Sequence, residues 1–131
     1  MAQSNVLGFS PTGWVAGGTI PVNTMVKLHS VEGQVVVTTA ITSVPFGVAM
    51  TSAVSGGTLK VQQHGVAKVT ASGVIALGAQ VVASANGKVE TFTGVGATAI
   101  SAGVALTAAA ADGDVIEVML ATPVVFGPAN T

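Results

Sequence analysis

The side chains that could do chemistry are few and far apart. His29 and His64 are the only histidines, and no carboxylate lies at a spacing typical of a site shared with either. Asp112-Gly113-Asp114 is similar to a fragment of a calcium loop, but such loops need several oxygen ligands within about a dozen residues. Only Glu117 lies nearby. We therefore interpret the histidines as surface or interface residues and the acidic motif as a turn.

The sequence also lacks the common motifs of nucleophilic and phosphate chemistry. It contains no cysteine and no Gly-x-Ser-x-Gly motif. Gly94-Val95-Gly96 is a lone Gly-x-Gly without the further glycine or the lysine of a phosphate-binding loop. We therefore expect no enzymatic activity, no catalytic residue, no metal site and no cofactor.

The composition favours contact with other protein surfaces over contact with water, nucleic acid or lipid. Half of the residues are apolar and only 7% are charged, against roughly 25% in an average domain. Four scattered lysines without any arginine cannot neutralise many phosphates, which argues against nucleic-acid binding. Two uncharged stretches, 33–59 and 91–111, are long enough to span a membrane. Their glycines, threonines and small residues argue against membrane insertion.

One β-unit occurs twice in the chain. Residues 47–57 return as residues 103–113 with six of eleven positions identical, beginning with Gly-Val-Ala in both. The repeat extends toward the N-terminus at an offset of 54 to 56 residues, where Gly18, Ile20 and Val26 correspond to Gly73, Ile75 and Val81, and 32–35 to 86–89. Two copies of one unit are more typical of a structural building block than of a catalyst.

Short runs rich in valine, isoleucine and threonine, bounded by glycine turns, predict strands throughout the repeat. The expected strands are 24–28, 34–39, 46–50, 59–64, 66–70, 79–83, 88–92, 103–106 and 115–120. The alanine-rich run 105–111 predicts a helical turn ended by Asp112-Gly113. We expect an all-β fold, a small β-barrel or β-sandwich built from two similar units of about 55 residues. It forms a single duplicated domain over 18–122, with copy one at about 18–65 and copy two at about 73–120.

Both ends of the chain are interpreted as extended arms, residues 1–17 and 123–131. Each carries large apolar side chains outside the regular β pattern: Phe9 and Trp14 in the first, Val125 and Phe126 in the second. Aromatic anchors dominate the energetics of many interfaces, so we expect these four residues to contact a neighbouring subunit. Packing within the chain is the alternative for each.

Five short motifs, taken in order, resemble those of one protein family. They are Gly18-Thr19-Ile20, Met25-Val26-Lys27-Leu28, Phe46-Gly47-Val48-Ala49, Gly57-Thr58-Leu59-Lys60-Val61 and His64-Gly65-Val66. Over about residues 13–120 the chain is similar to the head-decoration, or capsid cement, proteins of tailed bacteriophages. The duplication and the very low charge depart from the usual pattern of that family.

The resemblance implies a structural virion protein made in the host cytoplasm. It would bind as a homotrimer on the outer surface of the capsid and clamp neighbouring subunits of the major capsid protein, with neither nucleic acid nor membrane as a partner. A phage surface or fibre module that recognises a host glycan is the alternative, although one tryptophan and no tyrosine offer few aromatic platforms for a sugar. A small-ligand barrel or hydrolase would need a pocket with converging titratable groups.

Overall fold

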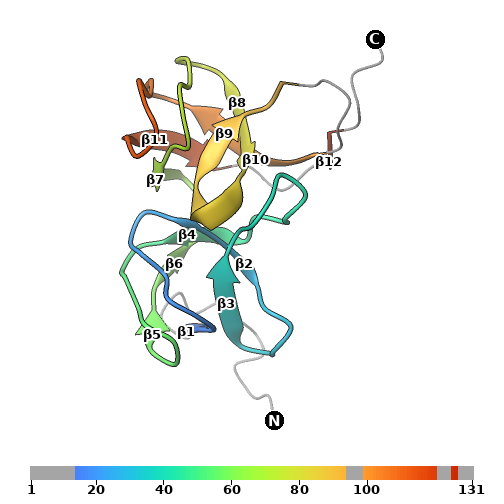
Figure 1. Cartoon of the computed structure of the whole chain (residues 1–131), viewed down its shortest axis with the longest axis vertical. Coiled ribbons are helices and arrows are strands. Elements are labelled where there is room, and N and C mark those ends of the chain that lie inside the picture. The colour runs from blue at the N-terminus through green and yellow to red at the C-terminus, as the bar shows by residue number, and fades with distance from the viewer. Residues whose placement is uncertain (1–13, 94–98, 121–124, 127–131) are drawn as a thin grey trace.

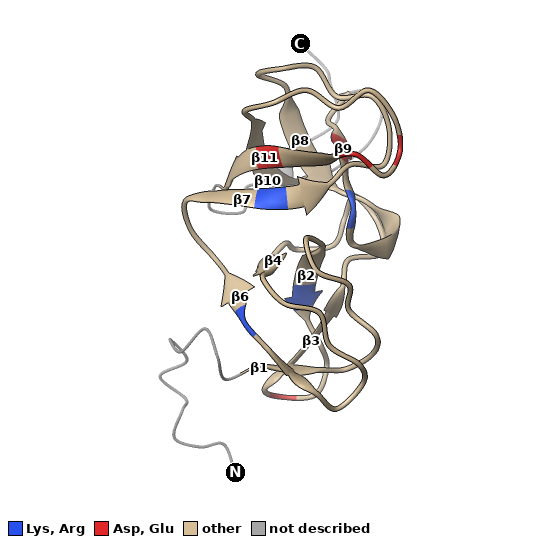
Figure 2. Ribbon diagram, turned by 90° about the vertical axis from the view of Figure 1, so that its left-hand side faces the viewer, with Lys and Arg blue, Asp and Glu red and all other residues tan. Residues whose placement is uncertain are grey.

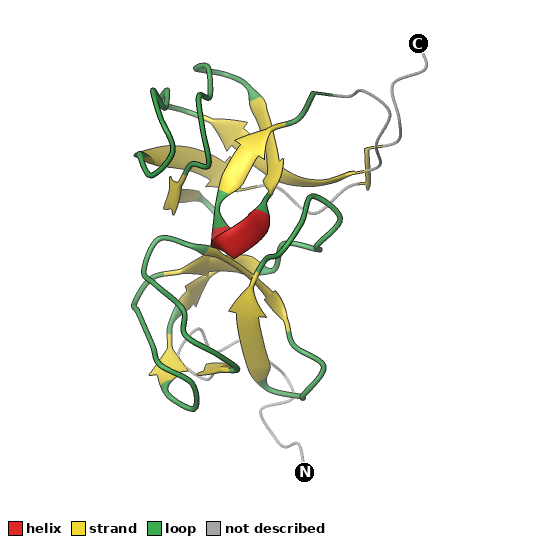
Figure 3. Ribbon diagram, viewed as in Figure 1, coloured by secondary structure: helices red, strands yellow, loops and turns green. Residues whose placement is uncertain are grey.

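The computed structural model describes residues 14–93, 99–120 and 125–126, and within them the chain is all-β, as predicted. The helical content of these residues is one 3-10 turn, Ala85–Gly87. The strands form two sheets that lie one above the other along the long axis of the molecule (Figure 1; Figure 3).

The first sheet contains six short strands in the order β5-β1-β3-β2-β4-β6. Their bounds are β1 Trp14–Ala16, β2 Met25–Leu28, β3 Gln34–Val37, β4 Gly47–Ala49, β5 Thr58–Leu59 and β6 Val61–Gln62. Only Lys60 separates β5 from β6, yet these two strands occupy opposite ends of the strand order. The sheet therefore curls until it nearly closes into a small barrel.

The second sheet has the order β7-β11-β10-β8-β9, and β12 pairs with β10. Its strands are β7 Val66–Thr70, β8 Gln80–Ala83, β9 Val89–Thr91, β10 Ala99–Ala105, β11 Val115–Leu120 and β12 Val125–Phe126. A parallel bridge between Ala71 and Val89 joins the residue after β7 to the strand at the far edge. This sheet also curls back on itself.

Alternation along the strands determines which side chains form the core. In β7 and β11, Ala67, Val69, Ile116 and Val118 are buried, whereas their neighbours are exposed apart from the half-buried Thr70. This period of two is the geometric signature of a strand with one face inward. The buried side chains form two clusters, one mainly within each sheet, and most of their members are alanine, valine or isoleucine.

Equivalent backbone hydrogen bonds recur at positions that the sequence repeat aligns. Ile20 and Ala53 exchange two N–H···O bonds of 2.8 and 2.9 Å in the first sheet, and Ile75 and Ala109 exchange two of 3.0 and 2.9 Å in the second. The parallel pairing of Ala16 with Val35 corresponds likewise to that of Ala71 with Val89. Local geometry thus follows the repeat at these positions, while the division of the chain into two copies stays a prediction.

Hydrogen bonds and shared packing tie the two sheets together. The buried Thr38 Oγ1 donates to the Ser84 carbonyl at 2.8 Å, and Gly87 N–H donates to the Thr38 carbonyl at 3.0 Å. Met25 and Val48, from strands of the first sheet, belong to the core cluster of the second. The sheets therefore pack as one body.

Several expected boundaries were wrong. Trp14–Ala16, assigned to an N-terminal arm ending at residue 17, form β1 between β3 and β5, and Ala16 is 1% exposed. The expected strand 59–64 is interrupted at Lys60, and the strand expected at 103–106 begins at Ala99. The run 105–111 is not helical, because Ala109 pairs with Ile75 in a β-bridge. No helix of the described residues is both long enough and apolar enough to cross a membrane.

Candidate functional site

Four loops form one largely uncharged side of the molecule, which we call the loop face. They are residues 17–24 and 50–57 of the first sheet and residues 71–79 and 106–114 of the second. The bridges described above hold each pair together, and both pairs project to the same side of the molecule, on the left in Figure 3. The loop face therefore extends over both sheets.

Large apolar side chains point outward from these loops. Ile20 and Ile75 are buried, so residues beside them face away from the core. The most exposed large apolar side chains among the described residues all lie here: Val74 at 74%, Leu77 at 70% and Val54 at 69%. Exposed apolar side chains gathered in one region are typical of interaction sites.

The charged side chains of the loop face already have partners within the chain. Asp112 and Asp114 are the only charged residues of the four loops. Asp112 Oδ1 accepts from Lys88 Nζ at 2.8 Å, and Asp114 Oδ2 accepts from the N–H groups of Ala110 and Ala111 at 2.8 and 3.1 Å. Elsewhere, charged residues are scattered over the described chain rather than clustered (Figure 2). The loop face thus presents mainly apolar and small polar groups, and its exposed carboxylate, Asp112, is paired with Lys88.

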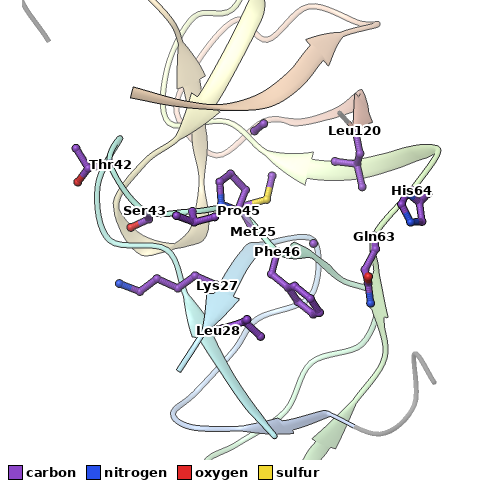
Figure 4. A pocket seen from close by; sticks show the side chains of 13 residues that line it. Met25, Lys27, Leu28, Thr42, Ser43, Pro45, Phe46, Gln63, His64 and Leu120 are labelled. Atoms are coloured by element: carbon purple, nitrogen blue, oxygen red, sulfur yellow. The ribbon is translucent and has the colours of Figure 1, made fainter. Parts of the chain in front are cut away.

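A groove of about 660 Å³ lies between the two sheets. Its apolar lining includes Met25, Leu28, Pro45, Phe46, Ala102 and Leu120, contributed by both sheets (Figure 4). Lys27 and His64 are its titratable side chains, and Figure 4 shows them on opposite sides of the groove. Lys27 Nζ donates to Thr39 Oγ1 at 3.2 Å. None of the described residues that line the groove carries a carboxylate.

The chemistry-bearing residues of the sequence have local structural roles. His29 Nδ1 accepts the Val31 N–H at 3.0 Å. The carboxylate of Asp114 holds its own turn, as the turn interpretation requires. Within the described residues, no three histidine, aspartate or glutamate side chains gather where they could hold a metal ion.

The predicted anchor residues are not brought together in the described structure. Trp14 lies in β1 and packs edge-on against Phe46, with ring centroids 4.7 Å apart and an interplanar angle of 70°. Val125 and Phe126 form β12 through backbone pairing with Ile100 and Ala99. Phe9 lies outside the described residues. A role in subunit contact stays a prediction for all four.

Sequence reasoning missed the apolar residues of the loop face. It selected the largest side chains as anchors and assigned no role to the valines and the leucine that lie between the expected strands. The usable signal was the repeat itself. Ile20 and Ile75 occupy aligned positions, each two residues after a glycine, so an inward isoleucine at both positions implies outward immediate neighbours.

The comparisons with known proteins agree with the all-β architecture. A family model described as phage cement protein matches residues 11–120. No curated protein matches the chain. Among solved structures, the N base of head fiber gp8.5 in bacteriophage phi29 superimposes with a TM-score of 0.68 at 13% sequence identity, over 83% of this chain and 91% of that one. At this identity the likeness concerns the fold.

Proposed function

We propose, from the premise that this chain belongs to the phage cement protein family, that it binds the outer surface of a phage head as a trimer and cements neighbouring major capsid subunits. As a member of that family it is a structural virion protein. The trimeric state, the capsid subunits as partner and the outer location are the parts that require a test.

The observation that carries this proposal is the amount of uncharged, apolar surface on a small chain. The loop face and its exposed valines and leucine would be an aggregation hazard if they remained in water. A specific protein interface buries about 1,600 Å² in total. The loop face spans both sheets, so such a contact could cover much of it without any change of fold.

A second exposed surface supports self-association. Val66, Met119 and Val104 lie side by side on β7, β11 and β10 with their side chains outward, and we call this surface the wall. Wall and loop face consist of different residues, so a chain could contact sister copies through one and the shell through the other. A trimer would then repeat its shell contact three times, and linked contacts bind far more tightly than single ones.

The test is light scattering of the purified full-length protein, followed by co-sedimentation with heads of its phage that lack the protein. We expect a trimer mass, saturable binding and heads that withstand higher temperature once decorated. A chain that stays monomeric at high concentration, or that does not sediment with heads, would overturn the proposal.

A truncation separates the N-terminal segment from the fold. Because Trp14 belongs to β1, the deletion must stop at residue 13. We expect the shortened chain to keep the circular dichroism spectrum of the intact protein and to occupy fewer sites on the head. Equal occupancy by both forms would show that residues 1–13 do not contribute to binding.

A further inference from the structure

We propose that the loop face is the surface that docks on the capsid shell, and that each chain supplies two repeat-related contacts to it, one from each sheet. This inference rests on the proposed function. It adds which surface binds, how often each chain binds and what kind of surface the partner must present.

The first step is that the two loop pairs form one rigid platform. Asn23 lies in loop 17–24, and Thr70 immediately precedes loop 71–79. Thr70 donates to the Asn23 carbonyl twice, from its N–H at 2.8 Å and from Oγ1 at 3.1 Å. This pair of bonds fixes the loops of one sheet relative to the loops of the other. Binding therefore requires little ordering of this surface, which lowers its entropic cost.

The second step is that the two sheets present similar chemistry. The repeat aligns Val22 with Leu77 and Val54 with Ala110, and all four are exposed. In each sheet these residues flank a buried isoleucine that is bridged to an alanine. A shell built from many copies of one subunit offers the same surface repeatedly, so a chain with two similar contacts can engage two such places.

The third step is the nature of the partner surface. The two aspartates of the loop face are engaged by Lys88 and by backbone N–H groups, and the remaining side chains are apolar or small and neutral. A matching surface on the capsid subunit is therefore apolar and uncharged. Attachment through such a surface depends little on ionic strength, in contrast to contacts between opposite charges.

The other exposed features fit this role less well. The groove is recessed between the sheets and carries Lys27 and His64. The wall includes Lys68 directly opposite Glu117 on adjacent strands, with no ion pair between these two described side chains, so burial would desolvate two unpaired charges. Asp112 of the loop face, by contrast, is paired with Lys88. Among the surfaces that the described residues form, the loop face combines the most exposed apolar side chains with aspartates that are engaged within the chain.

The experiment uses full-length variants in the co-sedimentation assay. One double variant, Val74→Asp with Leu77→Asp, places negative charge on the loops of the second sheet. A single variant, Val54→Asp, places negative charge on the loops of the first sheet. The matched control is Val31→Asp, an apolar residue with 49% exposure outside the four loops. Each loop variant should keep the oligomer mass and the circular dichroism of the unmodified protein. Each should bind heads at least about 30-fold more weakly, because a charge replaces an apolar side chain that the proposed contact with the shell would bury.

The outcomes discriminate clearly. The inference is supported if both loop variants lose affinity for heads and if a variant that combines all three loop substitutions loses more than either. The affinity of the Val31→Asp control must stay within about threefold of that of the unmodified protein. Wild-type affinity should also change by less than about tenfold between roughly 0.05 and 0.5 M NaCl. Loop variants that bind normally, a control that loses equally, or a steep salt dependence would overturn this inference. Failure of the unmodified protein to bind heads would instead overturn the proposed function.

Discussion

Replacing Gly103 by alanine should destabilise the fold strongly, although the change adds only one methyl group. Gly103 opens the second Gly-Val-Ala motif and lies in β10 beside β11, with φ at +152°, a conformation that side chains with Cβ rarely adopt. A Cβ at this position would collide with the backbone carbonyl oxygen of Met119 and would lie 3.0 Å from Val118 Cγ1. Neither the backbone strain nor the collision can be relieved by rotating a side chain.

The size of the effect follows from these two terms. An unfavourable φ costs about 1–3 kcal/mol, and overpacking a dense core costs about another 1–3 kcal/mol. The sum, about 2–6 kcal/mol, is a large share of the roughly 5–15 kcal/mol that stabilises a typical domain. Gly47 opens the first motif, and its Cβ would lie 2.5 Å from the Gln62 carbonyl oxygen without the positive φ. Gly47→Ala should therefore cost only the overpacking part.

Two other repeat-aligned glycines provide the matched controls. A Cβ at Gly18 or at Gly73 would have no heavy atom within 4 Å apart from the neighbouring residues. Alanine at either position should leave stability unchanged or raise it by about 0.4–1 kcal/mol through the unfolded state.

The assay is urea unfolding at one fixed protomer concentration, monitored by far-UV circular dichroism and by the fluorescence of the single tryptophan, Trp14. The expected order of stability is Gly73→Ala at or above the unmodified protein, then Gly47→Ala, then Gly103→Ala. Unfolding free energies for Gly103→Ala and Gly73→Ala that agree within about 1 kcal/mol would refute the reasoning.

Two further substitutions test individual hydrogen bonds. Thr38→Val removes the buried hydroxyl that donates to the Ser84 carbonyl and should lower the free energy of unfolding in urea by about 1–3 kcal/mol. Thr38→Ser keeps the hydroxyl and should lower it clearly less. Equal losses in the two variants would contradict a hydrogen-bond role. Asp114→Ala removes the acceptor of two backbone N–H groups and should lower the free energy of unfolding by about 1–2 kcal/mol. Hydrogen exchange at the Ala110 and Ala111 amides should become faster. Unchanged exchange at both amides would show that the carboxylate does not hold this loop.

The fold class and many strands could be predicted because local pattern and final structure agree in them. Val66–Thr70 and Val115–Leu120 have the bounds that their composition predicts. β1 was missed because three residues in a glycine- and proline-rich context carry no period, and pairing with the distant β3 and β5 defines the strand. The expected helical turn at 105–111 failed for a related reason, since a long-range bridge overrides the helix propensity of alanine.

The candidate site was harder to predict than the fold because exposure is a tertiary property. Sequence alone ranks Trp14 as an anchor for its size, but the ring packs on Phe46 within the first sheet. Val74 and Leu77 look like core residues until the bridge between Ile75 and Ala109 fixes which side chains point inward. The outward direction of Val74 then follows from alternation beside the buried Ile75. Leu77 is exposed for another reason, because it lies in a turn closed by the Ala79 N–H, which donates to the Ala76 carbonyl at 3.1 Å.

The low charge content and the two-sheet arrangement have a common explanation in the proposed role. A chain with 7% charged residues cannot cover its surface with solvated groups. Here the charges within the loops are used internally, by Lys88 with Asp112 and by Asp114 with its own turn. Thr70 joins the loops of both sheets through Asn23, so the two loop pairs are held in a fixed position relative to one another. A rigid and neutral platform is suited to permanent burial against a shell, and a protein that acts free in solution would gain nothing from it.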